Sequence, residues 1–232
     1  MKVKLLRHTP DPERLCAAAA MTSYKGEGTA RLFKDLGIET ARKTIRRVLG
    51  YGHYSVIEHA SFTFSVEGVS RALTHQLVRH RIASYSQQSQ RYVTYDTLEH
   101  YVAPQNISGN EEAKGIYNDA LKHISKTYQR LLKLDVPTED ARFLLPNAAK
   151  TNILITMNAR ELRHFFSLRC CERSQWEIRK MAIEMLRQVK KVAPTIFENA
   201  GPSCVELGYC PEGELKPPKC RIEEITRRFR EL

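Results

Sequence analysis

The stretch Arg79-His80-Arg81-Ile82-Ala83-Ser84-Tyr85-Ser86-Gln87-Gln88-Ser89-Gln90-Arg91 is the most informative part of this sequence. Arginine and histidine side chains are followed there by a dense run of Ser and Gln. Guanidinium groups bind phosphate oxygens in pairs, and hydroxyl and amide groups suit a hydrogen-bonding base. These residue types indicate a site for a phosphorylated ligand, although a solvated basic turn would have the same composition.

The motif begins where a helix is expected to end. Ser70 is a good N-cap, and two leucines four residues apart follow it, which predicts a helix from Ser70 to about Arg81. Successive helical residues project about 100° apart, so that Arg79 and Arg81 would face different anions. Residues 82–90 are expected to form a polar loop and residues 91–95 a short strand.

The rest of the chain predicts a mixture of helices and strands. Strict alternation predicts a strand over residues 61–66 that ends at Gly68, and apolar β-branched residues predict another over 152–157. An edge strand is expected at 1–7, and helices at 12–21, 39–49, 111–132, 138–144, 159–168 and 174–192. Because strands and helices do not alternate regularly, the fold class is predicted to be α+β, a helix-rich single domain around a small, mostly antiparallel sheet.

The domain is expected to span residues 1–200. Residues 201–232, which contain Gly, Pro and Cys, would form a C-terminal extension packed on the domain or trailing from it. No apolar run reaches the ~18 residues of a membrane span. The N-terminus lacks the apolar segment of a secretory signal, so a cytoplasmic protein without a membrane partner is expected.

The charge balance favours anionic partners. The 232 residues include 37 Lys and Arg against 26 Asp and Glu, a net charge of +11. A nucleic-acid-binding module is one interpretation of this excess. Against it, the aromatic residues are scattered and no strip of alternating basic and aromatic residues occurs. The basic residues occur among Ser, Gln, Asn and His, which suits a shaped pocket for a phosphorylated small molecule, so no nucleic-acid partner is expected.

The six cysteines do not form a standard metal motif. Cys204, Cys210 and Cys220 lie in a Gly- and Pro-rich segment, where they are either free thiols or metal ligands completed by a residue from elsewhere. Because their spacing matches no standard zinc pattern, no metal is predicted. Cys170 and Cys171 have no evident base beside them, which argues against a cysteine nucleophile.

Further polar clusters lie before a strand and around a helix. His53, Ser55 and Glu58 precede the strand at residue 61 and suit acid–base chemistry, metal binding or simple capping. Asn158 begins the helix at residue 159, where free N–H groups attract anions.

Basic residues are spaced along that same helix. His164 lies four residues after Arg160, on the same face. Arg160 and Arg169 are separated by about 13 Å of helix rise, so they could hold opposite ends of a long ligand but not one phosphate. Arg142 is a further candidate, and each arginine could instead form a surface ion pair.

Together these blocks resemble the flavin-dependent thymidylate synthases. The family signature is Arg-His-Arg, seven residues and then Ser, which Arg79-His80-Arg81, residues 82–88 and Ser89 match, and Arg91 completes the fuller pattern. Other family-like segments follow in the same order: Gly52-His53 to Glu58-His59, Asn158-Ala159-Arg160, Leu168-Arg169 and Gln175-Trp176-Glu177-Ile178.

The resemblance implies an enzyme that methylates dUMP to dTMP, with FAD as cofactor, methylene-tetrahydrofolate as carbon donor and NADPH as reductant. It implies a homotetramer with active sites shared between subunits. FAD would be held by His53, Ser55, Glu58, Arg79, His80, Arg81, Gln87, Asn158, Arg160 and His164. dUMP would be held by Gln76, Arg79, Gln87, Gln88, Ser89, Gln90, Arg91, Arg142 and Arg169.

The resemblance makes Arg169 the activating residue beside the uracil ring, and the chemistry agrees. A fixed cation stabilises the negative charge that develops on the N3/O4 side of uracil, and no cysteine nucleophile is then needed. The chain departs from many members at Ser86 and Gln87, where Asn and Glu are common, and from some at His164, where Asn occurs. A different flavoprotein for a phosphorylated ligand is the remaining alternative.

Overall fold

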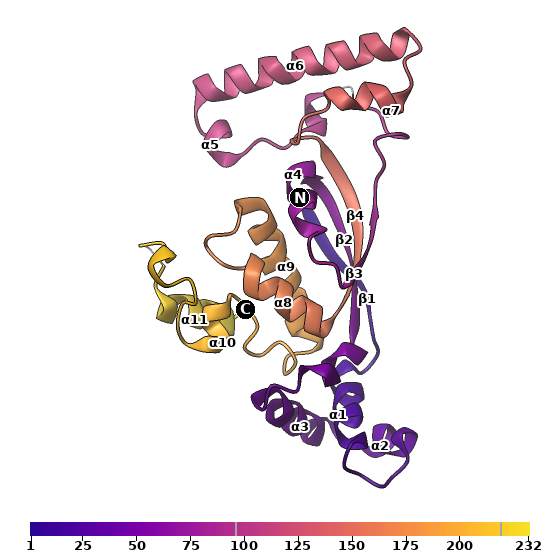
Figure 1. The fold of residues 1–232 in the computed structure, drawn as a ribbon, viewed down its shortest axis with the longest axis vertical. Helices are drawn as coiled ribbons and strands as arrows, with labels where there is room; N and C mark the ends of the chain where they lie inside the picture. The colour runs from indigo at the N-terminus through magenta and orange to yellow at the C-terminus, as the bar shows by residue number, and fades with distance from the viewer. Residues whose placement is uncertain (96, 219) are drawn as a thin grey trace. The chain divides into compact units, whose positions relative to one another are not determined.

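A computed structural model of the chain describes residues 1–95, 97–218 and 220–232. It contains a four-stranded antiparallel sheet in the order β1-β2-β4-β3, accompanied by many helices (Figure 1). The strands are β1 (Lys2–His8), β2 (Ser61–Ser70), β3 (Ala83–Gln87) and β4 (Lys150–Asn158). The α+β prediction is confirmed, and β1 is an edge strand as expected.

The helices match most of the expected positions. They are α1 (Pro12–Thr22), α2 (Thr29–Asp35), α3 (Ile38–Gly50), α4 (Arg71–Leu77), α5 (Gln105–Ser108), α6 (Glu111–Lys133), α7 (Thr138–Ala141), α8 (Ala159–Arg169), α9 (Trp176–Val192), α10 (Ser203–Leu207) and α11 (Ile222–Arg230). Short 3₁₀ turns are η1 (Tyr54–His59), η2 (Leu98–His100), η3 (Arg142–Leu144) and η4 (Gly213–Leu215). The helix α2 and the turn η1 were not expected from the sequence.

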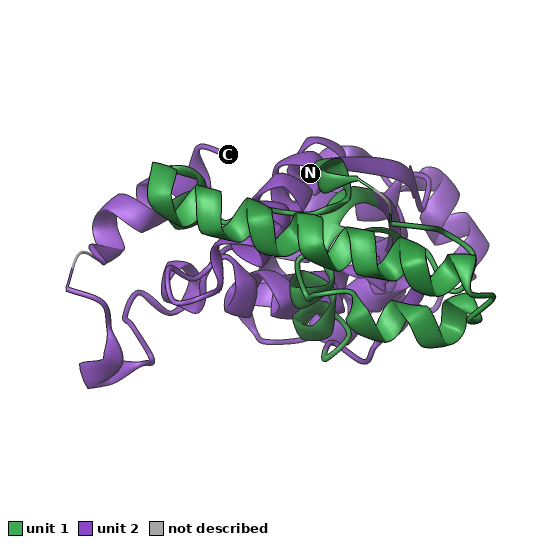
Figure 2. Ribbon diagram, turned by 90° about the horizontal axis from the view of Figure 1, so that it is seen from above, with its two compact units in different colours: residues 1–2, 66–79, 86–153 green, residues 3–65, 80–85, 154–232 purple. Residues whose placement is uncertain are grey.

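The described chain divides into two compact units (Figure 2). Unit 1 comprises residues 1–2, 66–79 and 86–153, and unit 2 comprises residues 3–65, 80–85 and 154–232. The chain therefore passes from one unit to the other several times, twice within the 79–91 motif. Strands β2 and β4 each contribute residues to both units.

The core of unit 1 lies along α6. Tyr128 is fully buried on this helix, and Leu121 is 4% exposed. They form a cluster with Tyr95, Tyr101 and two alanines. The amphipathic pattern of α6 thus serves packing within unit 1.

Unit 2 is built around a chain of aromatic side chains. Phe62 of β2 meets Phe197 edge-on at 5.4 Å, and Phe197 meets Phe166 of α8 at 6.0 Å. Phe166 in turn meets Phe165 at 5.7 Å. Edge-to-face rings of this kind pack tightly and lock the orientation of the elements that carry them. Helix α8, which carries several candidate site residues, is therefore firmly seated within its unit.

The N-terminal helices of unit 2 pack through small residues. The alanine run of α1 is buried, with Ala17 fully enclosed, and α1 contacts both α3 and η1. Small side chains allow helices to approach closely, and Ile45 of α3 is fully buried. This packing positions η1, which carries Ser55 and Glu58.

The local structure of the 79–91 motif differs from the expectation. The Ser70 cap is confirmed, because its side chain accepts a hydrogen bond from the N–H of Leu73 at 3.1 Å. However, α4 ends at Leu77, so the expected helix to Arg81 is wrong. Beyond the end of the helix, His80 is buried. The argument from helical spacing for Arg79 and Arg81 therefore no longer applies.

The expected loop over 82–90 is also wrong, since residues 83–87 form β3. This strand lies at the sheet edge beside β4, where main-chain pairing suffices without apolar alternation. No strand occurs at 91–95, where the chain turns. Gly68 does not end β2: it adopts a φ of +67° within the strand, which a residue without a Cβ tolerates.

Candidate active site

A buried histidine links the two ends of α8 in unit 2. His80 is 4% exposed, and its Nε2 atom accepts a hydrogen bond from the Nε–H of Arg169 at 3.0 Å. Its Nδ1 atom lies 3.4 Å from Oε1 of Glu161. Since Nε2 accepts, the ring proton belongs on Nδ1 and faces the carboxylate. The predicted residues His80 and Arg169 are thus brought together, and Glu161 joins them.

The electrostatics of this group follow from burial. Burial lowers the pKa of His80 to about 4, and the charge of Arg169 and then His164 add to the effect. Burial also raises the pKa of Glu161 and lowers the pKa of Arg169. His80 is therefore neutral at physiological pH and can accept from the guanidinium, which remains charged.

Aromatic contacts and the backbone hold the imidazole in place. Phe165 meets its ring edge-on at 4.9 Å, and His164 lies at 5.7 Å. The hydroxyl of Tyr85 donates to the main-chain carbonyl of His80 at 2.8 Å. The ring thus has little freedom to turn away from Arg169.

The beginning of α8 and η1 carry further predicted FAD residues. Nη1 of Arg160 donates to Oε1 of Glu58 at 2.5 Å, with both side chains about half exposed. Asn158 accepts from the N–H of Glu161 at 2.9 Å and so caps the helix. Arg160 thus forms an ion pair, the alternative expected for each arginine, and Asn158 caps α8.

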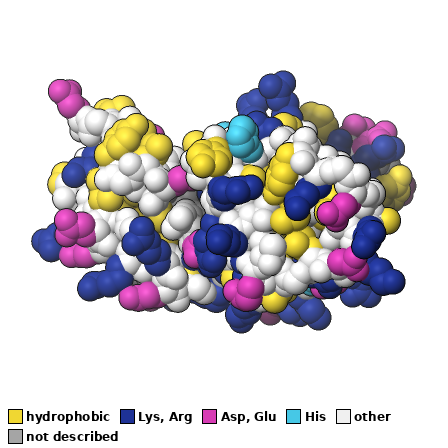
Figure 3. Space-filling model, turned by 90° about the horizontal axis from the view of Figure 1, so that it is seen from below, with side chains coloured by type: hydrophobic (Ala, Val, Ile, Leu, Met, Phe, Trp, Pro, Cys, Tyr) yellow, Lys and Arg dark blue, Asp and Glu magenta, His cyan; other side chains and the backbone are white. Residues whose placement is uncertain are grey.

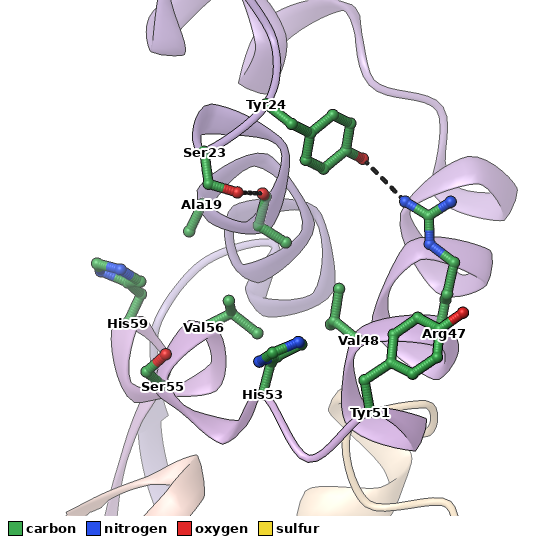
Figure 4. A pocket seen from close by; sticks show the side chains of 11 residues that line it. Ala19, Ser23, Tyr24, Arg47, Val48, Tyr51, His53, Ser55, Val56 and His59 are labelled. Atoms are coloured by element: carbon green, nitrogen blue, oxygen red, sulfur yellow. Dashed lines mark hydrogen bonds between the residues drawn. The ribbon is translucent and has the colours of Figure 1, made fainter.

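A cavity of about 580 Å³ in unit 2 contains two more predicted FAD residues, His53 and Ser55 (Figure 4). Its wall opposite them carries Tyr24 and Arg47, and Nη2 of Arg47 donates to the hydroxyl of Tyr24 at 3.4 Å. Tyr51 stands at the rim, 72% exposed. Aromatic rings, a cation and hydroxyl groups suit a ligand with a flat ring and an anionic group.

The predicted dUMP residues gather in unit 1, except Arg169. The amide of Gln87 donates to the hydroxyls of Thr74 and Thr151 at 3.2 and 3.3 Å, and both threonines are 1% exposed. Gln88 pairs through its N–H with the carbonyl of Asn152 at 2.8 Å. Gln87 therefore has an orientation fixed by buried partners.

Arg91 and Arg142 converge on one residue of α7. Nη2 of Arg91 lies 2.8 Å from Oε2 of Glu139, and Nε of Arg142 donates to the main-chain carbonyl of Glu139 at 3.0 Å. Ser89 accepts from the N–H of Arg91 at 3.2 Å. The structure thus brings two predicted dUMP-binding arginines to one residue, Arg91 to its carboxylate and Arg142 to its main-chain carbonyl.

The other predicted residues have different surroundings. Gln76 donates to the carbonyl of Ala72 at 3.3 Å, and Gln90 is 9% exposed. Arg79 and Arg81 are exposed and belong to different units, the first to unit 1 and the second to unit 2.

The cysteines do not form a recognisable site. All six are free thiols, and burial raises the pKa of Cys170 and Cys204. In the described ranges 1–95, 97–218 and 220–232, no group of three or more His, Cys, Asp or Glu is placed to hold a metal ion. Within the same ranges, no helix combines the length and apolarity needed to cross a membrane.

One face of the molecule shows how the charge is distributed (Figure 3). Lys and Arg side chains on this face alternate with acidic and apolar ones instead of merging into one patch. The net charge of +11 is therefore not concentrated there in a continuous basic surface.

Comparison with known proteins identifies the family. A family model described as "Thymidylate synthase complementing protein" matches residues 4–195. A flavin-dependent thymidylate synthase of Geobacter sulfurreducens is 53% identical, over 100% of this chain and 99% of its own length. The chain belongs to the flavin-dependent thymidylate synthase family. The synthase of the same name from Clostridium tetani is 48% identical, over 93% of this chain and 92% of its own length.

Solved structures of flavin-dependent thymidylate synthases share the fold. A crystal structure of the Helicobacter pylori enzyme, complexed with FAD and dUMP, matches with a TM-score of 0.70 and 24% identity. The match covers 87% of this chain and 100% of that chain.

Sequence reasoning missed Glu161, Glu139 and the cavity wall formed by Tyr24 and Arg47. Glu161 could have been noticed as an acidic residue in the first turn of a helix that carries an expected catalytic arginine. Nothing in the sequence marks Tyr24 or Arg47, because their proximity to His53 depends on how α1, α3 and η1 pack.

Proposed function

We propose that this chain catalyses the reductive methylation of dUMP to dTMP, with methylene-tetrahydrofolate as carbon donor and NADPH as reductant through FAD. The observation that carries the proposal is the half-buried guanidinium of Arg169, held at Nε by a neutral His80 at 3.0 Å. The proposal rests equally on family membership, since relatives at 53% and 48% identity are named flavin-dependent thymidylate synthases.

In this reaction Arg169 acts electrostatically. When C6 of uracil gains a hydride, negative charge develops on the N3/O4 side of the ring, and a fixed cation there lowers the barrier. Arginine keeps its proton, so Arg169 orients and stabilises but does not shuttle protons. Because burial lowers its pKa only from a high starting value, the side chain stays charged in its partly buried position.

The residues of unit 2 fit a flavin cofactor by their chemistry. The cavity with His53 and Ser55 offers aromatic and hydroxyl surfaces, and Arg160 provides a guanidinium at the N-terminal end of α8. His164, Asn158, Glu58, His80 and Arg81 complete the proposed set within this unit, joined by Arg79 and Gln87 of unit 1. FAD, when bound, supplies the redox chemistry that passes a hydride from NADPH to the nucleotide.

Unit 1 supplies the proposed dUMP side chains other than Arg169. Gln87, with its amide fixed by Thr74 and Thr151, can hydrogen-bond the nucleotide or the flavin with its remaining oxygen. Arg91, Arg142 and Ser89 suit the phosphate. Gln76, Arg79, Gln88 and Gln90 complete the proposed set.

We further propose a homotetramer in which subunits share active sites, without nucleic-acid or membrane partners. A cytoplasmic location agrees with six free thiols, which stay reduced there. The residues 1–200 would form the catalytic domain and 201–232 an extension packed on it. In support, Arg228 of α11 donates to Glu172 at 2.8 Å.

The test is an assay of dTMP formation with dUMP, methylene-tetrahydrofolate, NADPH and FAD, omitting one component at a time. Arg169→Ala should retain FAD and lose turnover, because the remaining site still binds the cofactor. Arg187→Ala, an arginine paired on the surface with Glu184, is the matched control and should behave as wild type. Near-normal turnover in Arg169→Ala would refute the role of this residue. Protein that binds nucleic acid but takes up no FAD would favour the binding-module alternative.

A further inference from the structure

We propose that Glu161 is a positioning residue, which keeps the ring proton of His80 on Nδ1 so that Nε2 can hold the guanidinium of Arg169. The proposal rests on the function proposed above for Arg169. It assigns a role to a residue that belongs to neither the FAD set nor the dUMP set.

Two contacts join the three side chains within unit 2, with His80 between Glu161 and Arg169. Glu161 lies in the first turn of α8 and Arg169 is its last residue, so that about 12 Å of helix rise separates their backbones. His80, from the segment between α4 and β3, bridges them with 3.4 Å on the Glu161 side and 3.0 Å on the Arg169 side. One imidazole thus connects both ends of the helix.

Because His80 and Glu161 are buried, their hydrogen bonds depend on protein partners. The side chains of His80 and Glu161 are 3% and 7% exposed, so water cannot readily replace either partner. The backbone of Glu161 is also fixed, because its N–H donates to the Asn158 side chain that caps α8. A carboxylate would not be placed in such surroundings for packing alone, since an apolar side chain of similar size would avoid its desolvation.

The tautomer of the ring decides whether Arg169 is held. A neutral imidazole carries one proton, on Nδ1 or on Nε2. If the proton moved to Nε2, an N–H would face the Nε–H of Arg169, and two donors repel. The Glu161 carboxylate only accepts, so it favours the proton on Nδ1 and leaves the Nε2 lone pair for Arg169. The ring of His164 also lies 5.7 Å from that of His80, and its charge would disfavour a second proton on the His80 ring.

The test combines a spectroscopic and a kinetic measurement on the full chain. In ¹⁵N-histidine-labelled protein, His80 should give the nitrogen shifts of an Nδ1–H ring, assigned by their loss in His80→Gln. Glu161→Leu removes the acceptor at similar volume and should convert the signal to an Nε2–H ring. If Glu161→Leu does not fold, Glu161→Gln takes its place: its amide can accept or donate, so a mixture of both tautomers is expected.

We expect kcat to decrease when the ring proton of His80 moves from Nδ1 to Nε2. We expect kcat of Glu161→Leu to fall about tenfold or more, as for loss of a hydrogen bond to a charged group, with a smaller change in the KM for dUMP. FAD content is measured for each variant and kcat is expressed per bound flavin, because His80 belongs to the proposed FAD set. In the His80→Gln background, where the amide oxygen offers an acceptor that does not depend on a tautomer, Glu161→Leu should cost little more.

The outcomes separate this proposal from the proposed function. An Nδ1–H ring that persists in Glu161→Leu would overturn the positioning role, and so would kcat losses that add up independently in the double variant. Wild-type protein that makes no dTMP would instead defeat the proposed function, while the tautomer measurement would still decide whether Glu161 controls His80.

Discussion

Acidification should destabilise this chain through one buried imidazole. His80 is 4% exposed, and its pKa is lowered from 6.5 to about 4, first by burial and then by the charges of Arg169 and His164. Below pH 6.5 the unfolded ring takes up a proton, whereas the folded ring stays neutral until about pH 4. The unfolded state therefore binds more protons in this window. The stability that His80 contributes is complete above pH 6.5 and lost as the pH falls towards 4.

The size of the effect follows from the shift. The pKa falls by about 2.5 from 6.5 to about 4, and a change of one in pKa corresponds to about 1.4 kcal/mol, which gives at most about 3.5 kcal/mol. At pH 5 roughly 1.5 units have been traversed, so the expected loss is about 2 kcal/mol. For a chain of this length that loss lowers Tm by roughly 4–8 °C.

Thermal unfolding of wild type and His80→Gln at pH 7.5 and pH 5 measures how much His80 contributes to the pH dependence of stability. The wild type should lose about 2 kcal/mol more than the variant on acidification. Glu161 remains in both proteins, so the opposite effect of its raised pKa largely cancels. His123→Gln, at an exposed position of α6, is the matched control and should follow the wild type. If wild type and His80→Gln lose stability in parallel, the buried neutral imidazole is not the cause.

Three further substitutions test other parts of the reasoning. Asn158→Ala should lower the free energy of unfolding by about 1 kcal/mol, because its side chain caps α8 at 2.9 Å, and Asn158→Asp should restore it in urea titrations. Cys170→Ala should leave dTMP turnover within about twofold, because a fully buried thiol with a raised pKa is no nucleophile, and strong loss of turnover in folded protein would contradict this. Glu139→Gln should lower the KM for dUMP by up to about fivefold, because this carboxylate competes with phosphate for Arg91 at 2.8 Å, and an unchanged KM would remove Arg91 from the phosphate site.

The regular elements of the fold were predictable because they carry strong periodic signals. The alternation of Phe62, Phe64 and Val66 marked β2, and all three side chains are fully buried. β3 was missed because its residues are polar or small: a strand at a sheet edge is held by main-chain pairing, which leaves no hydrophobic pattern. The end of α4 at Leu77 was missed because no Gly or Pro marks it, and the contact of His80 with Phe165 of α8 joins residues 85 positions apart in the sequence.

The residues of the candidate site also include some that the sequence predicts and some that it does not. Residues in contiguous blocks, such as His80 and Arg169, could be named from the sequence, and the structure brings these two into contact. The roles of Glu161 and Glu139 could not be predicted, because they depend on partners 81 and 48 residues away, which are His80 for the first and Arg91 for the second. A single sequence carries no signal that pairs an acidic residue with a partner so distant in the chain.

Helical spacing predicted that Arg79 and Arg81 face different anions. In the structure, the two residues are separated instead because they belong to different compact units. Arg79 belongs to unit 1, residues 80–85 to unit 2, and residues 86–91 to unit 1 again. Most residues proposed for FAD lie in unit 2, and all those proposed for dUMP except Arg169 lie in unit 1. The chain changes units twice inside the motif, so residues proposed for FAD and residues proposed for dUMP both occur there although they belong to different units. Arg169 differs from the other residues proposed for dUMP because it lies in unit 2. Its Nε–H donates to His80, the histidine of the 79–91 motif, which belongs to the same unit.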